Sequence, residues 1–111
     1  MAAIANLTID QGATFSSDVT VKDANGQAFD LTGYTAAAKM AKGFASTRTR
    51  INMSTSIATD ATTGVVTLSL TATETGDLDA ERYVYDLEIT KDAGVTRVIE
   101  GIITVRPQVT V

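Results

Sequence analysis

The chain has 111 residues, of which 44% are hydrophobic and 20% are charged, and its formal net charge is −4. This length predicts one domain over residues 1–111, and this composition is typical of a chain that buries an apolar core rather than one that stays disordered. The excess of acidic residues argues against nucleic acid as a partner, because binding to a phosphate backbone depends on Lys and Arg.

The chain contains no Cys and no His. Their absence removes disulfides, thiolate metal ligands and the commonest general base, so we expect no enzymatic activity and no cofactor or metal. No stretch approaches the run of about eighteen apolar residues that spans a membrane, and the first residues, Met1–Ala5, lack the charged start and long apolar run of a signal peptide. We therefore expect no membrane partner.

Several runs alternate between apolar and polar residues, which is the period-two pattern of strands with one buried face. In chain order the runs are Asn6–Ile9, Phe15–Val21, Tyr34–Ala41, Ile51–Ala58, Val65–Leu70, Tyr83–Ile89 and Val95–Val105. In the run from Tyr83 to Ile89, every odd-numbered residue is apolar or aromatic, so these side chains are predicted to face the core. Helical spacing fits none of these runs well.

The last run carries apolar residues on both faces, which indicates either a central strand or a bulge. We assign the odd-numbered residues Ile99, Ile103 and Val105 to the core. Val98 and Ile102 then lie on the opposite face. Pro107 ends the strand, because proline cannot donate a hydrogen bond to the ladder.

Two dipeptides predict tight hairpin turns. Asn25-Gly26 and Ala93-Gly94 offer the positive φ that such turns require. Asp23 and Asp92 stand just before them, where a carboxylate can accept hydrogen bonds from the turn backbone.

A capping-box sequence, Thr71–Glu74, predicts a helical turn from Ala72 to about Leu78 that crosses from one sheet to the other. Tyr83 stands four residues after Asp79 at the start of a long strand, as in the tyrosine corner of immunoglobulin-like domains. Together these features predict an all-β fold, an immunoglobulin-like two-sheet Greek-key sandwich of about seven strands with one short helical crossover.

Two groups of acidic residues admit a chemical interpretation. Asp86 and Glu88 could form a catalytic carboxylate pair, but their alternation with core residues favours a solvated strand face. Asp23–Gly26 with Asp30 could be a fragment of a calcium loop, yet its spacing completes no such loop and a hairpin turn explains the same residues.

Charge is unevenly distributed along the chain. The stretch Leu31–Thr59 has four basic residues and no Asp or Glu, whereas acidic residues crowd the segment from Glu74 to Glu88. The basic segment 41–50 has two interpretations: the favoured one is a solvated loop with its Phe tucked over a sheet edge, and the functional hypothesis is a contact arm that docks on an acidic neighbour, such as the segment Glu74 to Glu88 of another copy. The apolar end of the chain, 107–111, is predicted to be a docking tail. The predicted partner-contact residues are Lys42, Phe44, Arg48, Arg50, Val109 and Val111.

A family resemblance covers the chain from about Ile9 to Pro107. Its motifs are Asp10–Phe15 (DQGATF), Val21–Gln27 (VKDANGQ), Asp30–Thr35 (DLTGYT), Gly64–Thr75 (GVVTLSLTATET), Arg82–Ile89 (RYVYDLEI) and Glu100–Pro107 (EGIITVRP). In order and spacing the chain resembles immunoglobulin-like domains of tailed-phage virion proteins and is similar to the N-terminal domain of the phage baseplate upper protein family.

This resemblance implies a non-enzymatic structural protein of a virion, assembled in the host cytoplasm. The implied role is an adaptor or accessory module of the tail, baseplate or neck. Its partners would be other virion proteins, in a homo-oligomer or symmetric array. The alternatives are a capsid decoration or cement protein and a carbohydrate-binding adhesion module. Glycan binding is disfavoured, because sugar sites usually offer exposed aromatic platforms and the chain has no Trp.

Overall fold

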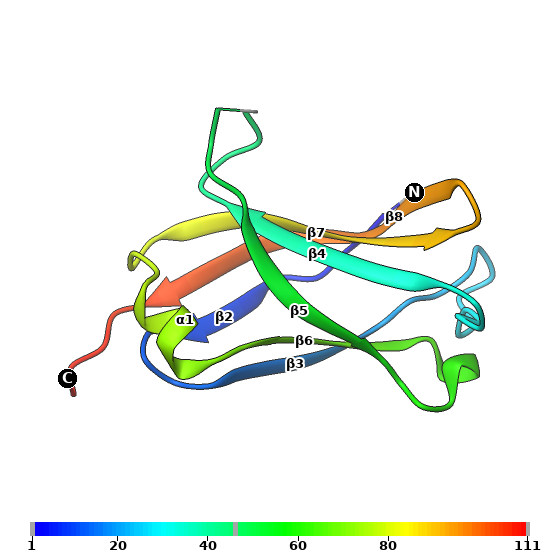
Figure 1. Cartoon of the computed structure of the whole chain (residues 1–111), viewed down its shortest axis with the longest axis horizontal. Coiled ribbons are helices and arrows are strands. Elements are labelled where there is room, and N and C mark those ends of the chain that lie inside the picture. The colour runs from blue at the N-terminus through cyan, green and yellow to red at the C-terminus, as the bar shows by residue number, and fades with distance from the viewer. Residues whose placement is uncertain (1, 46, 111) are drawn as a thin grey trace.

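The structure is a computed structural model that describes residues 2–45 and 47–110. These residues form eight strands in two facing layers, with a short helix and a 3₁₀ turn (Figure 1). The elements are β1 (Ala3–Ile4), β2 (Leu7–Asp10), β3 (Phe15–Thr20), β4 (Thr35–Ala41), β5 (Ile51–Ile57), the 3₁₀ turn η1 (Ala61–Thr63), β6 (Val65–Leu70), α1 (Ala72–Gly76), β7 (Arg82–Lys91) and β8 (Gly94–Arg106).

One strand belongs to both layers. The first half of β5 pairs with β4, from Ile51 to Met53, and its second half pairs with β6, from Ser54 to Ile57. The layer of β4, β7 and β8 is therefore joined to the layer of β6 and β3 through β5, which crosses between them in Figure 1. All named pairs are antiparallel except those of β1 and β2, which run parallel to β8.

The connection from β3 to β4 runs from one layer to the other, and so does the connection from β6 to β7, which contains α1. These two crossings give the strands a Greek-key order. This architecture confirms the predicted immunoglobulin-like sandwich with one short helical crossover.

The core lies between the layers and is built from the predicted alternating faces. On β7 the odd-numbered residues from Tyr83 to Ile89 are all buried, as are the alternate residues from Val66 to Leu70 on β6. The largest fully buried side chains are Ile9, Leu31, Met40, Leu68, Leu87, Ile89 and Ile103. Burial of apolar area is thus the main stabilising term of the fold.

Strand β8 contains a bulge, and its odd-numbered residues beyond the bulge face the core. Its register against β7 shifts where Leu87 pairs with Ile99 and Glu88 with Arg97, so Val98 is an extra, bulged residue. Beyond the bulge, the odd-numbered residues Ile99, Ile103 and Val105 are buried, whereas Ile102 is 42% exposed. The assignment of the odd-numbered residues to the core is confirmed, whereas Val98, predicted to lie on the opposite face, packs against the core at the bulge.

Of the two predicted turns, one is confirmed and the other needs a correction. Gly26 has a φ of 79°, and the Asp23 carboxylate accepts hydrogen bonds from the amides of Asn25 and Gln27. In the β7–β8 hairpin, Gly94 already pairs with Lys91, so the loop is Asp92-Ala93 and Asp92 has the positive φ, 54°. A short polar side chain tolerates this conformation better than most.

The crossover helix is tied to the turn between β2 and β3. Its capping box is complete, since the Thr71 hydroxyl accepts from the Glu74 amide and the Glu74 carboxylate accepts from the Thr71 amide. Thr75 is fully buried; its hydroxyl accepts from the Gly12 amide (3.0 Å) and donates to the Ala13 carbonyl (2.8 Å). A five-residue helix would be marginal alone, so these contacts hold it in place.

The backbone between β1 and β2 passes close to a glycine of β8. The Tyr85 hydroxyl donates to the Ala5 carbonyl (2.5 Å), and the Asn6 side chain accepts from the Ile102 amide (3.0 Å). A Cβ on Gly101 would lie 2.2 Å from the Ala5 carbonyl oxygen, so only glycine permits this approach.

We expect Gly101→Ala to lower the free energy of unfolding by about 1–3 kcal/mol, because the added methyl group must push the Ala5 backbone away. Urea titration followed by circular dichroism measures this loss. Gly43→Ala is the matched control, since its Cβ would meet its nearest atom, Arg48 Nε, at an ordinary 3.6 Å. Equal stability of the two variants would contradict the close contact at Gly101.

We also expect a steep loss of stability in alkali that depends on Tyr85. Burial raises the pKa of its hydroxyl from 10.0 to about 12, so the folded protein keeps a proton that the unfolded chain has lost. The contribution is complete below about pH 10 and disappears as the pH rises toward 12.

Urea midpoints at about pH 8 and about pH 11 test this prediction. Tyr85→Phe should lower stability at the lower pH by about 1 kcal/mol, through the lost hydrogen bond, and should flatten the alkaline decline. Tyr34→Phe, at the periphery of the core, is the control. An equally steep decline in Tyr85→Phe would assign the effect to other groups.

Candidate interaction surface

The segment that joins β4 to β5, described at residues 42–45 and 47–50, extends outward from the β4–β7 layer (Figure 1). We call it the β4–β5 loop. Arg50 organises it, because its guanidinium donates to the carbonyls of Ala45 (2.9 Å), Phe44 (3.0 Å) and Arg48 (3.1 Å). A planar group with five N–H donors suits such a cluster of carbonyls. Arg50 is therefore occupied within the loop.

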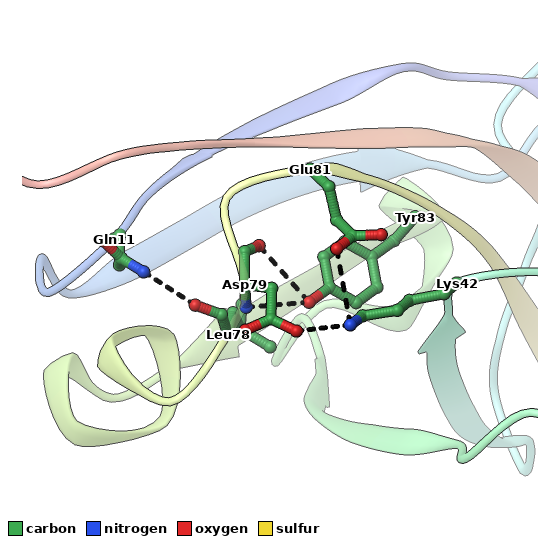
Figure 2. Close-up of polar contacts among 6 residues, drawn as sticks. All are labelled: Gln11, Lys42, Leu78, Asp79, Glu81 and Tyr83. Carbon is green, nitrogen blue, oxygen red and sulfur yellow. Dashed lines mark hydrogen bonds and ion pairs between the residues drawn. The ribbon is translucent and has the colours of Figure 1, made fainter.

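Lys42 at the base of the loop is also engaged within the chain. Figure 2 shows its ammonium between the carboxylates of Asp79 and Glu81, the latter at 3.4 Å. The hydrogen bond with Asp79 is the main cause that raises the pKa of Lys42. Part of the charge complementarity between the basic and acidic segments is thus satisfied in one molecule, where the loop meets the β6–β7 connection.

Tyr83 lies beside this ion pair and forms the predicted tyrosine corner. Its hydroxyl accepts from the Asp79 amide (3.0 Å) and donates to the Asp79 carbonyl (3.3 Å), as Figure 2 shows. Burial raises the pKa of the Tyr83 hydroxyl. The Gln11 side chain donates to the neighbouring Leu78 carbonyl (2.7 Å), so this connection is also held from the turn that follows β2.

Phe44 and Arg48 remain exposed on the loop. The Phe44 side chain is 74% exposed at the edge of a groove of about 300 Å³. The groove lies on the outer face of the β4–β7 layer, and its lining includes Lys39, Val84 and Glu88. Arg48 lines a second hollow, of about 270 Å³, between the loop and Tyr83. The loop thus exposes an aromatic ring and a cation.

Residues 107–110 follow β8 and lie away from the loop, at the end of the molecule where α1 also lies (Figure 1). The Gln108 amide donates to the Gln11 side chain (3.0 Å), and Val109 beyond it is 94% exposed. Val111 lies outside the described residues. The structure therefore brings four predicted contact residues together on one loop and places Val109 elsewhere.

Sequence reasoning missed the partners within the chain. Asp79 and Glu81 belong to the acidic segment noted in the sequence, but their pairing with Lys42 was not predicted, and neither was the binding of backbone carbonyls by Arg50. The opposite charges gave a signal for attraction, but they carried no information on whether the pair forms within one molecule or between two.

The carboxylates considered for metal binding serve as turn acceptors. Asp30 accepts from the hydroxyl and the amide of Thr32, and these hydrogen bonds lower its pKa. Asp86 lies on the outer sheet face, 3.4 Å from Arg97 Nε. Within residues 2–45 and 47–110, no three metal-ligating side chains gather into a cluster, and no helix is long and apolar enough to cross a membrane.

The fold, with its helical crossover and tyrosine corner, defines an immunoglobulin-like β-sandwich domain. No protein-family model and no curated protein matches the sequence. Among solved structures, it is similar to a chicken TCR, with a TM-score of 0.58 and 10% identity over 95% of this chain and 54% of that chain. This chain thus spans about half the length of that receptor chain.

It is also similar to the N-terminal domain of phage TP901-1 ORF48, with a TM-score of 0.57 and 12% identity over 92% of this chain and 85% of that chain. A third similar structure is Listeria monocytogenes InlP, with a TM-score of 0.50 and 13% identity over 95% of this chain and 28% of that chain. At these identities the similarity establishes the fold.

We expect Arg50→Ala to loosen the β4–β5 loop without unfolding the sandwich. The substitution leaves four loop carbonyls, those of Gly43, Phe44, Ala45 and Arg48, without their shared donor. Chymotrypsin cleavage after Phe44 should then accelerate at least severalfold, and Arg50→Lys should restore little protection, because one ammonium cannot reproduce the planar donor set. Wild-type cleavage kinetics in both variants would show that Arg50 does not order the loop.

Proposed function

We propose that this domain is a non-enzymatic structural module of a tailed-phage virion. It acts as an adaptor or accessory module of the tail, baseplate or neck and assembles by protein–protein contacts. The observation that carries the proposal is the similarity to the N-terminal domain of phage TP901-1 ORF48, which extends over 92% of this chain and 85% of that one. The sequence resemblance to the phage baseplate upper protein family supports the same role.

The chemistry of the chain supports a structural role. Without His or Cys, its polar side chains offer carboxylates, hydroxyls, amides, Lys and Arg. Many of these side chains already accept hydrogen bonds in turns, form the ion pair at Lys42 or take part in the cluster around Arg50. The exposed aromatic ring of Phe44 and the charge of Arg48 are instead suited to protein contacts, where aromatic residues and Arg are enriched.

The aromatic residues give little support to the alternative of glycan adhesion. The Tyr34 ring packs edge-on against Phe29, with centroids 5.5 Å apart, and the Lys91 ammonium lies 5.3 Å from its centroid. Tyr34 is therefore occupied on more than one side. Phe44 is a single exposed ring rather than a platform of several, which suits protein contact better than sugar stacking.

Purified particles of a phage that encodes the chain provide the direct test. Mass spectrometry should detect the chain in the particles at a copy number that matches a symmetric ring or shell. Electron microscopy with a labelled antibody should then separate a tail, baseplate or neck position from the alternative of capsid decoration. Absence of the chain from intact particles would overturn the virion proposal.

We expect Arg48→Glu to weaken incorporation into the particle and to change its salt dependence. Charge reversal on an exposed contact loop slows association with an acidic neighbour, since electrostatic steering governs the association rate. Competition between tagged variants at low and high salt measures the effect. Lys22→Glu, an exposed reversal on another loop, is the matched control. Equal incorporation of all three proteins would remove Arg48 from the contact.

A further inference from the structure

The outer face of the β4–β7–β8 layer carries a row of apolar side chains across three strands. Ala41 on β4, which is buried, pairs with half-buried Val84 on β7, which pairs in turn with Ile102 on β8. Ile102 is 42% exposed, and Ile4 on β1, also on this face, is 76% exposed. Solvated sheet faces usually carry polar residues, so this row marks a surface suited to burial against another molecule.

The neighbouring positions on the same face carry both signs of charge. Lys39 lies opposite Asp86, and the next pair along is Ala37 and Glu88. Arg97 lies 3.4 Å from Asp86 and 3.8 Å from Glu100. Among residues 2–45 and 47–110, Lys39 and Glu88 form no ion pair.

The β4–β5 loop stands at one side of this face and places Phe44 beside the groove. Lys39 and Glu88 both line the same groove, together with Val84. An apolar ring, an apolar floor and two opposite charges therefore lie within one surface. Such a surface is complementary to itself, which is what a two-fold interface requires, because each patch meets an identical patch.

We propose that this outer face binds a second copy of the chain around a two-fold axis. Phe44 of each copy enters the groove of the other, and Lys39 of one copy faces Glu88 of its partner copy. The molecule measures 42 Å along its longest axis and 23 Å along its shortest, and Figure 1, which looks down the shortest axis, shows the layers edge-on, so these two extents bound the outer face. A standard interface covers about 800 Å² on each partner.

Sedimentation velocity of the purified chain over a concentration series tests the proposal. We expect a reversible dimer with a dissociation constant in the micromolar range, about 1–100 µM. Phe44→Ala should raise this constant by about tenfold or more, because an aromatic anchor is lost. Lys22→Ala, at an exposed position of the β3–β4 connection, should leave it unchanged. A chain that stays monomeric up to about 500 µM would overturn the proposal.

A charge-swap cycle tests the register of the contact. Lys39→Glu and Glu88→Lys should each raise the dissociation constant by about tenfold, since each places like charges opposite one another. The double variant should return to within about threefold of the wild type. Both residues lie outside the core, and circular dichroism checks that each variant folds. A dimer unaffected by these changes and by Phe44→Ala would place the contact on another surface.

This inference gives the proposed virion module one partner, a second copy of itself, but the two proposals fail separately. A monomeric chain that is found in particles would overturn only the two-fold contact. A dimeric chain that is absent from particles would overturn only the virion role.

Discussion

Two buried tyrosine hydroxyls on β7 must each have a hydrogen-bond partner, and the rest of the structure depends on how these partners are supplied. Tyr83 and Tyr85 both point into the core, where an unpaired hydroxyl would cost free energy. Tyr83 bonds the backbone of Asp79 in the β6–β7 connection, and Tyr85 bonds the backbone of Ala5 at the N-terminal edge. One central strand thereby fixes two segments that lie far apart in the sequence.

The same strand links the fold to the candidate interaction surface. Because Tyr83 holds Asp79 in place, the Asp79 carboxylate lies where it contacts Lys42 at the base of the β4–β5 loop. The even-numbered residues of β7, which alternate with the tyrosines, form the floor of the outer face. The odd-numbered residues of β7 therefore pack in the core, and its even-numbered residues form the outer surface.

Local pattern predicted most of the fold, and long-range pairing accounts for what it missed. Alternation identified the strands, and the capping box identified α1, because both signals lie within a few neighbouring residues. The division of β5 between two layers was not predictable, since Ile51–Ile57 alternates in the same way whichever strand it pairs with. Asp92 adopts the positive φ expected of a glycine because the β7–β8 register, which no local pattern reveals, sets the loop length.

The candidate surface shows the same limit. Sequence composition identified a basic loop that contains Phe44, yet the exposure of this ring and the occupation of Lys42 and Arg50 by their own chain depend on tertiary contacts. This occupation carries a consequence for binding. A loop already ordered by Arg50 loses less conformational entropy when it docks than a mobile loop would, so a modest contact through Phe44 and Arg48 is more effective. Repetition of such a contact around a symmetric assembly then strengthens attachment without any further contact per copy.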